Sequence, residues 1–83
     1  MSRVITTLEL PDGGHWELCY ENRDLSLSRH DADGRVEECP LPARPRILEV
    51  GWLERSLTPH LGADDALRVA EMFHNDHADL FTG

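Results

Sequence analysis

The sequence predicts an α+β fold in which an antiparallel meander of three or four strands, over residues 3–38, is followed by two helices. Apolar and polar residues alternate with a period of two through the first half of the chain. Apolar residues recur at helical spacing through the second half. We expect the helices, over 45–57 and 64–81, to cover the apolar face of the sheet. A chain of 83 residues has room for one small domain, 1–83.

Four alternating segments, each bounded by turn residues, make up the predicted meander. They lie over 3–10, 15–21, 25–30 and 35–38, the last being short. An antiparallel sheet keeps one wet face when the other is packed. The predicted polar face carries Thr7, Glu9, His15, Glu17, Cys19, Glu21, Ser26, Ser28, His30 and Glu37.

The first turn sets which side chains face each other across the first two strands. A three-residue loop over 12–14, with its last glycine in the left-handed region, keeps the apolar residues on one side. This loop places Glu9 opposite Glu17, a like-charge pair that destabilises the sheet by roughly 0.2–1 kcal/mol. The turn between the second and third segments places His15 opposite His30 at one end of the polar face.

The two later turns are predicted from their turn residues. A four-residue loop over 21–24 places Leu18 opposite Leu27. The last turn, within 31–34, is either a two-residue Asp-Gly turn or a four-residue loop. Both alternatives keep Leu27 and Val36 on the same face.

The first helix is predicted to begin at Pro45 and to end before Pro59. Three prolines in 40–45 cannot continue a central strand, and proline is favoured as the first residue of a helix. Leu48 and Trp52 lie outside its main apolar stripe, so they either contact the last helix or form an exposed surface. The stripe consists of Ile47, Val50, Leu53 and Leu57.

The last helix, 64–81, carries an unbroken apolar arc with His77 near its middle and His74 near its edge. With Glu71 these residues form Glu-x-x-His-x-x-His, and ligands at this spacing can share one metal ion. A core histidine bonded to backbone explains the same pattern. We therefore predict no metal and no other cofactor.

The sequence contains no motif that favours an enzyme. Cys19 and Cys39 are too few for a disulfide framework, and neither has a basic neighbour in the sequence that would activate it. There is no nucleophile elbow and no phosphate-binding loop. We see no signal peptide or membrane span, so the expected setting is the reducing cytoplasm.

The net charge of −8 restricts the class of partner. Sixteen acidic residues stand against eight arginines, with no lysine. This balance excludes direct binding to nucleic acid or to an anionic membrane, because both need clustered cations. A concentrated negative surface instead steers a protein toward a basic partner, although it also serves plain solubility.

The predicted function is that of a small, acidic, non-enzymatic protein-binding module. Its specific form is an inhibitor, of the phage, immunity or antitoxin type, that masks the basic nucleic-acid-binding surface of a larger protein. One alternative is a homodimeric accessory or structural subunit. Another is a metal- or pH-responsive module that uses His74 and His77, or His15 and His30. The expected partner-binding residues are Glu9, Glu17, Glu21, Glu37, Leu48 and Trp52.

Overall fold

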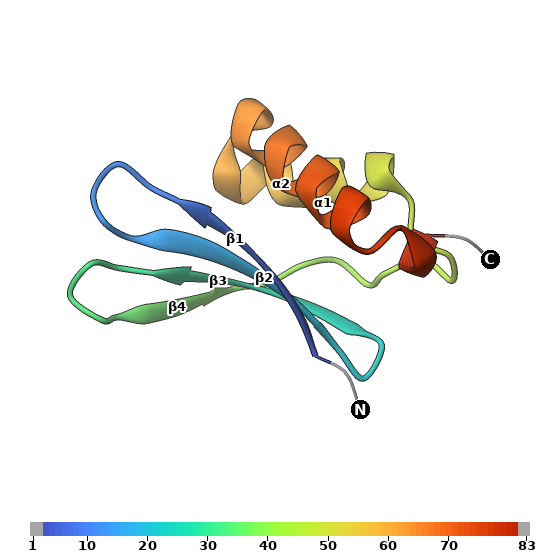
Figure 1. Ribbon diagram of the computed structural model, residues 1–83, viewed down its shortest axis with the longest axis horizontal. Helices are drawn as coiled ribbons and strands as arrows, with labels where there is room; N and C mark the ends of the chain where they lie inside the picture. Colours follow the sequence, from blue (N-terminus) through green and yellow to red (C-terminus); the bar gives the residue numbers. More distant parts are fainter. Residues whose placement is uncertain (1–2, 82–83) are drawn as a thin grey trace. The chain divides into compact units, whose positions relative to one another are not determined.

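A computed structural model describes residues 3–81 and divides the chain into two compact units, Met1–Leu41 and Pro42–Gly83. The first unit is a four-stranded antiparallel sheet, and the second holds two α-helices and a short 3-10 helix (Figure 1). The predicted α+β fold with a β-meander is therefore confirmed. That 1–83 is one domain, and that the helices cover the sheet, stay predictions.

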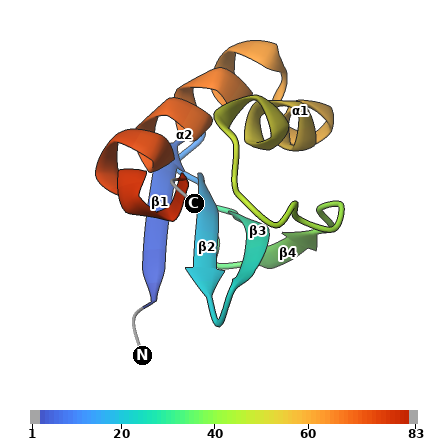
Figure 2. The same ribbon diagram turned by 90° about the vertical axis from the view of Figure 1, so that its right-hand side faces the viewer.

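The four strands lie side by side in sequence order (Figure 2). They are β1 (Val4–Glu9), β2 (His15–Glu21), β3 (Asp24–His30) and β4 (Val36–Cys39). One face carries the buried side chains of the sheet, namely Thr6, Trp16, Leu18 and Leu27.

The opposite face is called the polar face below. Side chains alternate between the two faces along each strand, and residues paired across strands point to the same face. The polar face therefore consists of His15, every second residue from it on β2, and the residues that continue this face on the other strands. Its members are Arg3, Ile5, Thr7, Glu9, His15, Glu17, Cys19, Glu21, Asp24, Ser26, Ser28, His30, Val36 and Glu38.

The β1–β2 turn lies one residue earlier than predicted. Its loop is Pro11–Gly13, and not 12–14, because Gly13 takes the left-handed position with φ 91°. The N–H of Leu10 donates to the carbonyl of Gly14 at 2.8 Å, which closes the loop. Proline is favoured as the first central residue of such a turn, so Pro11 belongs to the loop.

This earlier turn changes the pairing of β1 with β2. Glu9 lies opposite His15, and Glu17 lies opposite Thr7. The predicted like-charge pair of Glu9 and Glu17 is therefore wrong. The pairing of His15 with His30 is confirmed, because it depends only on the turn between β2 and β3.

The β2–β3 turn is tighter than predicted. Glu21 pairs with Asp24, so the loop contains only Asn22 and Arg23, with φ 54° and 66°. Positive φ at both central residues defines a type I′ hairpin turn. The register is the predicted one, with Leu18 opposite Leu27. The shorter loop only adds the pair of Glu21 and Asp24 and leaves the other pairs unchanged.

The turn conformation predicts that Arg23→Gly stabilises the protein. A non-glycine residue in the left-handed region costs about 1–2 kcal/mol, part of which glycine loses again through its greater freedom when unfolded. We expect a net gain of about 0.5–1 kcal/mol in the free energy of unfolding, measured by urea titration. Arg35→Gly is the matched control, because Arg35 is exposed and has negative φ. A gain no larger than that of the control would contradict the assigned turn.

The β3–β4 turn is neither of the two predicted alternatives. It is a three-residue loop over 32–34, closed by the N–H of Asp31 donating to the carbonyl of Arg35 at 2.8 Å. Its glycine has φ 94°, as in the first hairpin. Compared with a loop of two or four residues, a loop of three residues moves every side chain of the next strand to the opposite face of the sheet.

Because of that shift, Glu38 and not Glu37 lies on the polar face. Val36 lies on the polar face with 58% of its surface exposed, so the expected common face with Leu27 is wrong. Glu37 lies opposite Arg29, off the polar face, and Glu38 takes the place predicted for it.

Helix α1 (Val50–Leu61) begins later than the predicted start at Pro45. Glu49 is its N-cap, in an extended conformation, and its carbonyl accepts the N–H of Leu53 at 3.0 Å. Leu48 and Leu53 occupy the two positions of a hydrophobic staple, and both are buried. Proline alone therefore does not mark this helix start.

The later start also moves the apolar stripe. Ile47 is 49% exposed and Leu48 only 2%, so the predicted stripe is wrong at Ile47. The helix continues through Pro59 and ends at Gly62, whose N–H donates to the carbonyl of Thr58 at 2.9 Å. The predicted end before Pro59 is wrong, because Pro59 falls close enough to the C-terminal end for the chain to complete the turn.

Helix α2 (Ala63–Asp76) lies beside α1, and a 3-10 helix, Ala78–Phe81, follows it (Figure 1). The predicted single helix over 64–81 is therefore interrupted. His77, with φ −137° and ψ 48°, is the C-cap, preceded by asparagine and aspartate, which have low helix propensity. The buried face of α2 is formed by Ala66, Val69, Ala70 and Phe73.

Candidate functional site

The polar face is hollowed into a shallow pocket of about 280 Å³. Strands β2, β3 and β4 contribute to it, together with Arg3, which directly precedes β1. Carboxylates, hydroxyls and imidazole dominate its lining. The lining residues are Arg3, Glu17, Cys19, Glu21, Ser26, Ser28, His30, Val36 and Glu38.

Carboxylates outnumber cations on this face. Arg3 supplies its one arginine within the described residues 3–81. The pKa of Arg3 is raised, chiefly by its hydrogen bond to Cys19 and next by the charge of Cys19, with a smaller effect from the charge of Glu21. Cys19 therefore has a basic neighbour, contrary to expectation. The five carboxylates are those of Glu9, Glu17, Glu21, Asp24 and Glu38.

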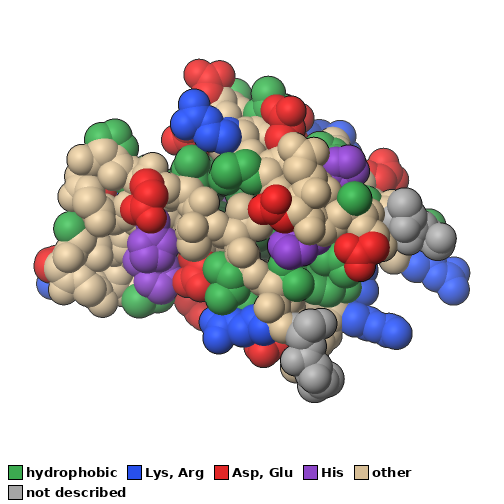
Figure 3. Space-filling model, viewed as in Figure 1, with side chains coloured by type: hydrophobic (Ala, Val, Ile, Leu, Met, Phe, Trp, Pro, Cys, Tyr) green, Lys and Arg blue, Asp and Glu red, His purple; other side chains and the backbone are tan. Residues whose placement is uncertain are grey.

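A cluster of two histidines and one glutamate lies at one end of the polar face. Nε2 of His30 lies 2.6 Å from Oε2 of Glu17 and 3.1 Å from Oγ of Ser28. The rings of His15 and His30 are stacked, with centroids 4.4 Å apart and planes 12° from parallel. Figure 3 shows histidine side chains beside acidic ones near the end of the sheet that holds the β1–β2 and β3–β4 turns.

Arg29 pairs with two aspartates of these turns. Its Nη2 donates to Oδ2 of Asp12 at 3.0 Å, and its Nε lies 3.5 Å from Oδ1 of Asp31. The guanidinium also lies 5.7 Å from the ring centroid of Trp16. Asp12 and Asp31 therefore add less to the negative surface than their number indicates, although exposed pairs of this kind contribute only about 0–1 kcal/mol to stability.

The predicted partner-binding residues do not all lie on one surface. Glu9, Glu17 and Glu21 lie on the polar face, whereas Glu37 does not. Leu48 is buried, so the alternative in which it forms an exposed surface with Trp52 is wrong. Trp52 is half-buried, and its role in a partner or homodimer contact stays a prediction.

The helical histidines do not complete a metal site. The ring of His74 lies 4.9 Å from that of Phe81, and the ring of His77 lies 5.4 Å from that of Phe73. Glu71 does not join them in a three-ligand group. Within residues 3–81, His15, Glu17 and His30 form the one group of three such side chains whose ligand atoms lie within 4.8 Å of one another.

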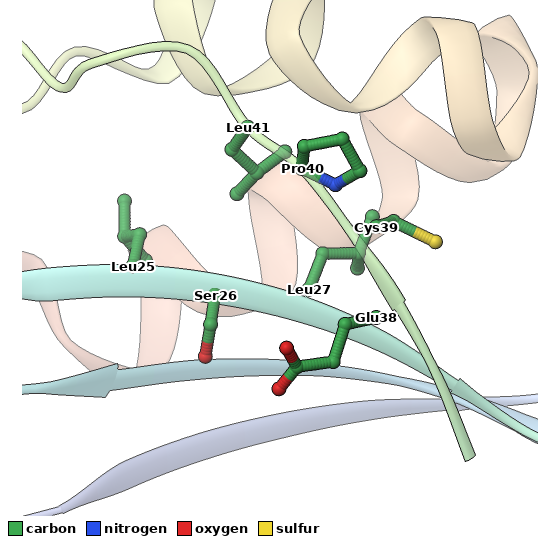
Figure 4. Close-up of a pocket in the computed structure, with 7 residues that line it drawn as sticks. All are labelled: Leu25, Ser26, Leu27, Glu38, Cys39, Pro40 and Leu41. Atoms are coloured by element: carbon green, nitrogen blue, oxygen red, sulfur yellow. The ribbon is translucent and has the colours of Figure 1, made fainter.

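A second pocket, of about 380 Å³, lies between β3 and the residues around the end of β4 (Figure 4). Leu25 and Leu41 point toward each other across it, and the Cys39 thiol points away from them. Burial chiefly raises the pKa of Cys39, and the charge of Glu37 adds to this effect. The thiol is protonated at neutral pH, so this pocket offers no activated cysteine.

No protein-family model, curated protein or solved structure significantly matches the chain. Within the described part of the chain, neither α-helix has the length and apolar character needed to cross a membrane.

Proposed function

We propose that this protein is a small, non-enzymatic protein-binding module whose polar face docks on a basic surface of another protein. The observation that carries the proposal is the charge of that face, with five carboxylates and one guanidinium among the described residues. Glu9, Glu21, Asp24 and Glu38 are exposed, and Glu17 is half-buried. Concentrated charge of one sign speeds encounter with a complementary surface and sets its orientation.

The pocket on the polar face has the chemistry to receive a cationic side chain. Its rim carries the carboxylates of Glu17, Glu21 and Glu38. After Cys19, the charges of Glu21 and Glu17 also raise the pKa of Arg3. A partner arginine would bind the same kind of acceptors, because guanidinium and carboxylate form strong, charge-assisted hydrogen bonds.

A basic protein surface is often a nucleic-acid-binding site, because such a site must neutralise phosphates. The specific form of the proposal is therefore an inhibitor, of the phage, immunity or antitoxin type, that covers such a surface. We also propose a reducing, cytoplasmic setting. In its support, Cys19 and Cys39 are free thiols whose side chains lie on opposite faces of the sheet.

The experiment is a titration of fluorescein-labelled nona-arginine, followed by fluorescence anisotropy. The Glu21→Gln/Glu38→Gln variant is expected to bind the peptide about tenfold more weakly, since each lost surface charge pair is worth up to about 1 kcal/mol. The matched control, Glu37→Gln/Glu71→Gln, loses the same net charge away from the polar face. It should bind nearly as tightly as the wild type.

The salt dependence of binding separates docking by charge from other modes. Raising the ionic strength should weaken peptide binding steeply for the wild type and less steeply for the Glu21/Glu38 variant. Equal loss of affinity in both double variants would show that net charge, and not this face, attracts the peptide. That result, or an affinity independent of salt, would contradict the proposal.

A further inference from the structure

We propose that His15, Glu17 and His30 form a binding site for a divalent transition metal, with zinc as the best-fitting ion. The proposal rests on the donor set and its placement in the sheet, and not on the protein-binding role proposed above. Each residue offers one ligand atom, and these atoms lie within 4.8 Å of one another.

The backbone places the three donors on adjacent positions of one surface. His15 and Glu17 are two residues apart on β2, so they point to the same side of the sheet. His30 on β3 lies directly opposite His15. The three Cβ atoms therefore form a triangle whose shape is set by strand pairing, not by a mobile loop. The backbone organises this triangle in advance.

Two of the three donor atoms already converge. Nε2 of His30 and Oε2 of Glu17 are 2.6 Å apart and share a hydrogen. When a metal ion takes the place of that hydrogen, a protonated imidazole releases the proton to solvent, whereas a neutral imidazole keeps its hydrogen on Nδ1; in both cases Nε2 and the carboxylate oxygen become ligands. Zinc–ligand bonds of about 2.0–2.2 Å at tetrahedral angles require a separation of roughly 3.3 Å, so these two atoms move apart by less than an ångström.

His15 completes the set by a side-chain movement. Its ring is stacked on that of His30, 4.4 Å away, and parallel stacking does not aim both rings at one point. Rotation of the half-exposed His15 ring turns a nitrogen toward the ion, within the 4.8 Å that now separates the ligand atoms. The fourth position of a tetrahedral ion is left for water.

The donor chemistry selects the class of metal. Two imidazoles and one carboxylate suit zinc and neighbouring transition metals, whereas magnesium and calcium prefer oxygen ligands alone. The other carboxylates of the polar face raise the local concentration of any cation. They do not favour zinc over magnesium, so selectivity must come from His15 and His30.

The test uses untagged, full-length protein and measures zinc affinity by competition with a chromophoric chelator. Removing one ligand, in His15→Ala or His30→Ala, should weaken zinc binding by more than the roughly 10–100-fold that loss of a second-shell partner costs. Glu17→Gln keeps the size of the side chain, removes its charge and should weaken binding as well. Magnesium should not compete with zinc.

The control is the His74→Ala/His77→Ala variant, which removes the other histidine pair and should bind zinc as the wild type does. Circular dichroism confirms that each variant is folded, and Glu17→Gln serves as the readout if an alanine variant is not. Imidazole nitrogen NMR shifts should change on zinc addition at His15 and His30 only. Wild-type protein without zinc affinity, or binding that survives in His30→Ala or is lost in the control, would overturn the proposal.

Discussion

Replacing Phe73 by alanine is expected to lower the free energy of unfolding by about 3–5 kcal/mol. Phe73 has no exposed surface, and its ring lies 5.4 Å from the ring of His77 and 5.7 Å from that of Phe81. The truncation removes buried apolar contacts and leaves a cavity where α2 meets the 3-10 helix. In a chain of 83 residues such a loss is a large part of the total stability. Urea unfolding followed by circular dichroism measures it.

Leu67→Ala is the matched control on the same helix. Leu67 lies on α2 as Phe73 does, but its side chain is 42% exposed. Its truncation should cost less than about 1 kcal/mol, because a surface site tolerates change and alanine favours helix. Equal losses for the two variants would contradict the assigned buried face of α2.

Gly14→Ala is expected to cost about 2–3 kcal/mol, because the added methyl group has no room. A Cβ at Gly14 would lie 2.5 Å from the backbone carbonyl oxygen of His30. That oxygen belongs to the neighbouring strand, so relief requires β2 and β3 to separate beside the pair of His15 and His30. The amide NMR signal of His30 should shift, and urea unfolding should show the loss.

Gly51→Ala is the control of opposite sign. A Cβ at Gly51 meets only the mobile end of Arg55, at 3.2 Å, within helix α1. Alanine is the better helix former, so this variant should gain up to about 1 kcal/mol. If Gly14→Ala proved as stable as the wild type, the close approach of the two strands would be refuted.

The alternation of apolar and polar residues predicts the meander, but the length and position of each turn decide which side chains of a strand lie on the polar face. Gly13 and Gly14 both satisfy the demand for a left-handed residue, so glycine cannot choose between the two loops. Pro11 favours the loop Pro11–Gly13, because the fixed φ of proline suits the first central position of a turn. The loop 32–34 contains the Asp-Gly pair of a two-residue turn, yet its extra residue places Glu38, and not Glu37, on the polar face.

The candidate site could be predicted in part. The pairing of His15 with His30 follows from the β2–β3 register, which either length of that turn preserves. The contact of Glu17 with His30 is diagonal across the strands and depends on side-chain rotamers that alternation does not reveal. The sequence leaves Leu48 either in contact with the last helix or exposed, because Pro45 indicates an earlier helix start. The structure buries Leu48, which occupies with Leu53 the two positions of a hydrophobic staple at the start of α1.

The most direct test of the polar face as a docking surface is an amide chemical-shift map of the wild-type protein titrated with nona-arginine. The proposal predicts that shifts concentrate on the strands around the pocket, at Glu17, Glu21 and Glu38, and fade as salt is added. Shifts that concentrate instead on the acidic residues of α2, or spread evenly over all carboxylates, would contradict it.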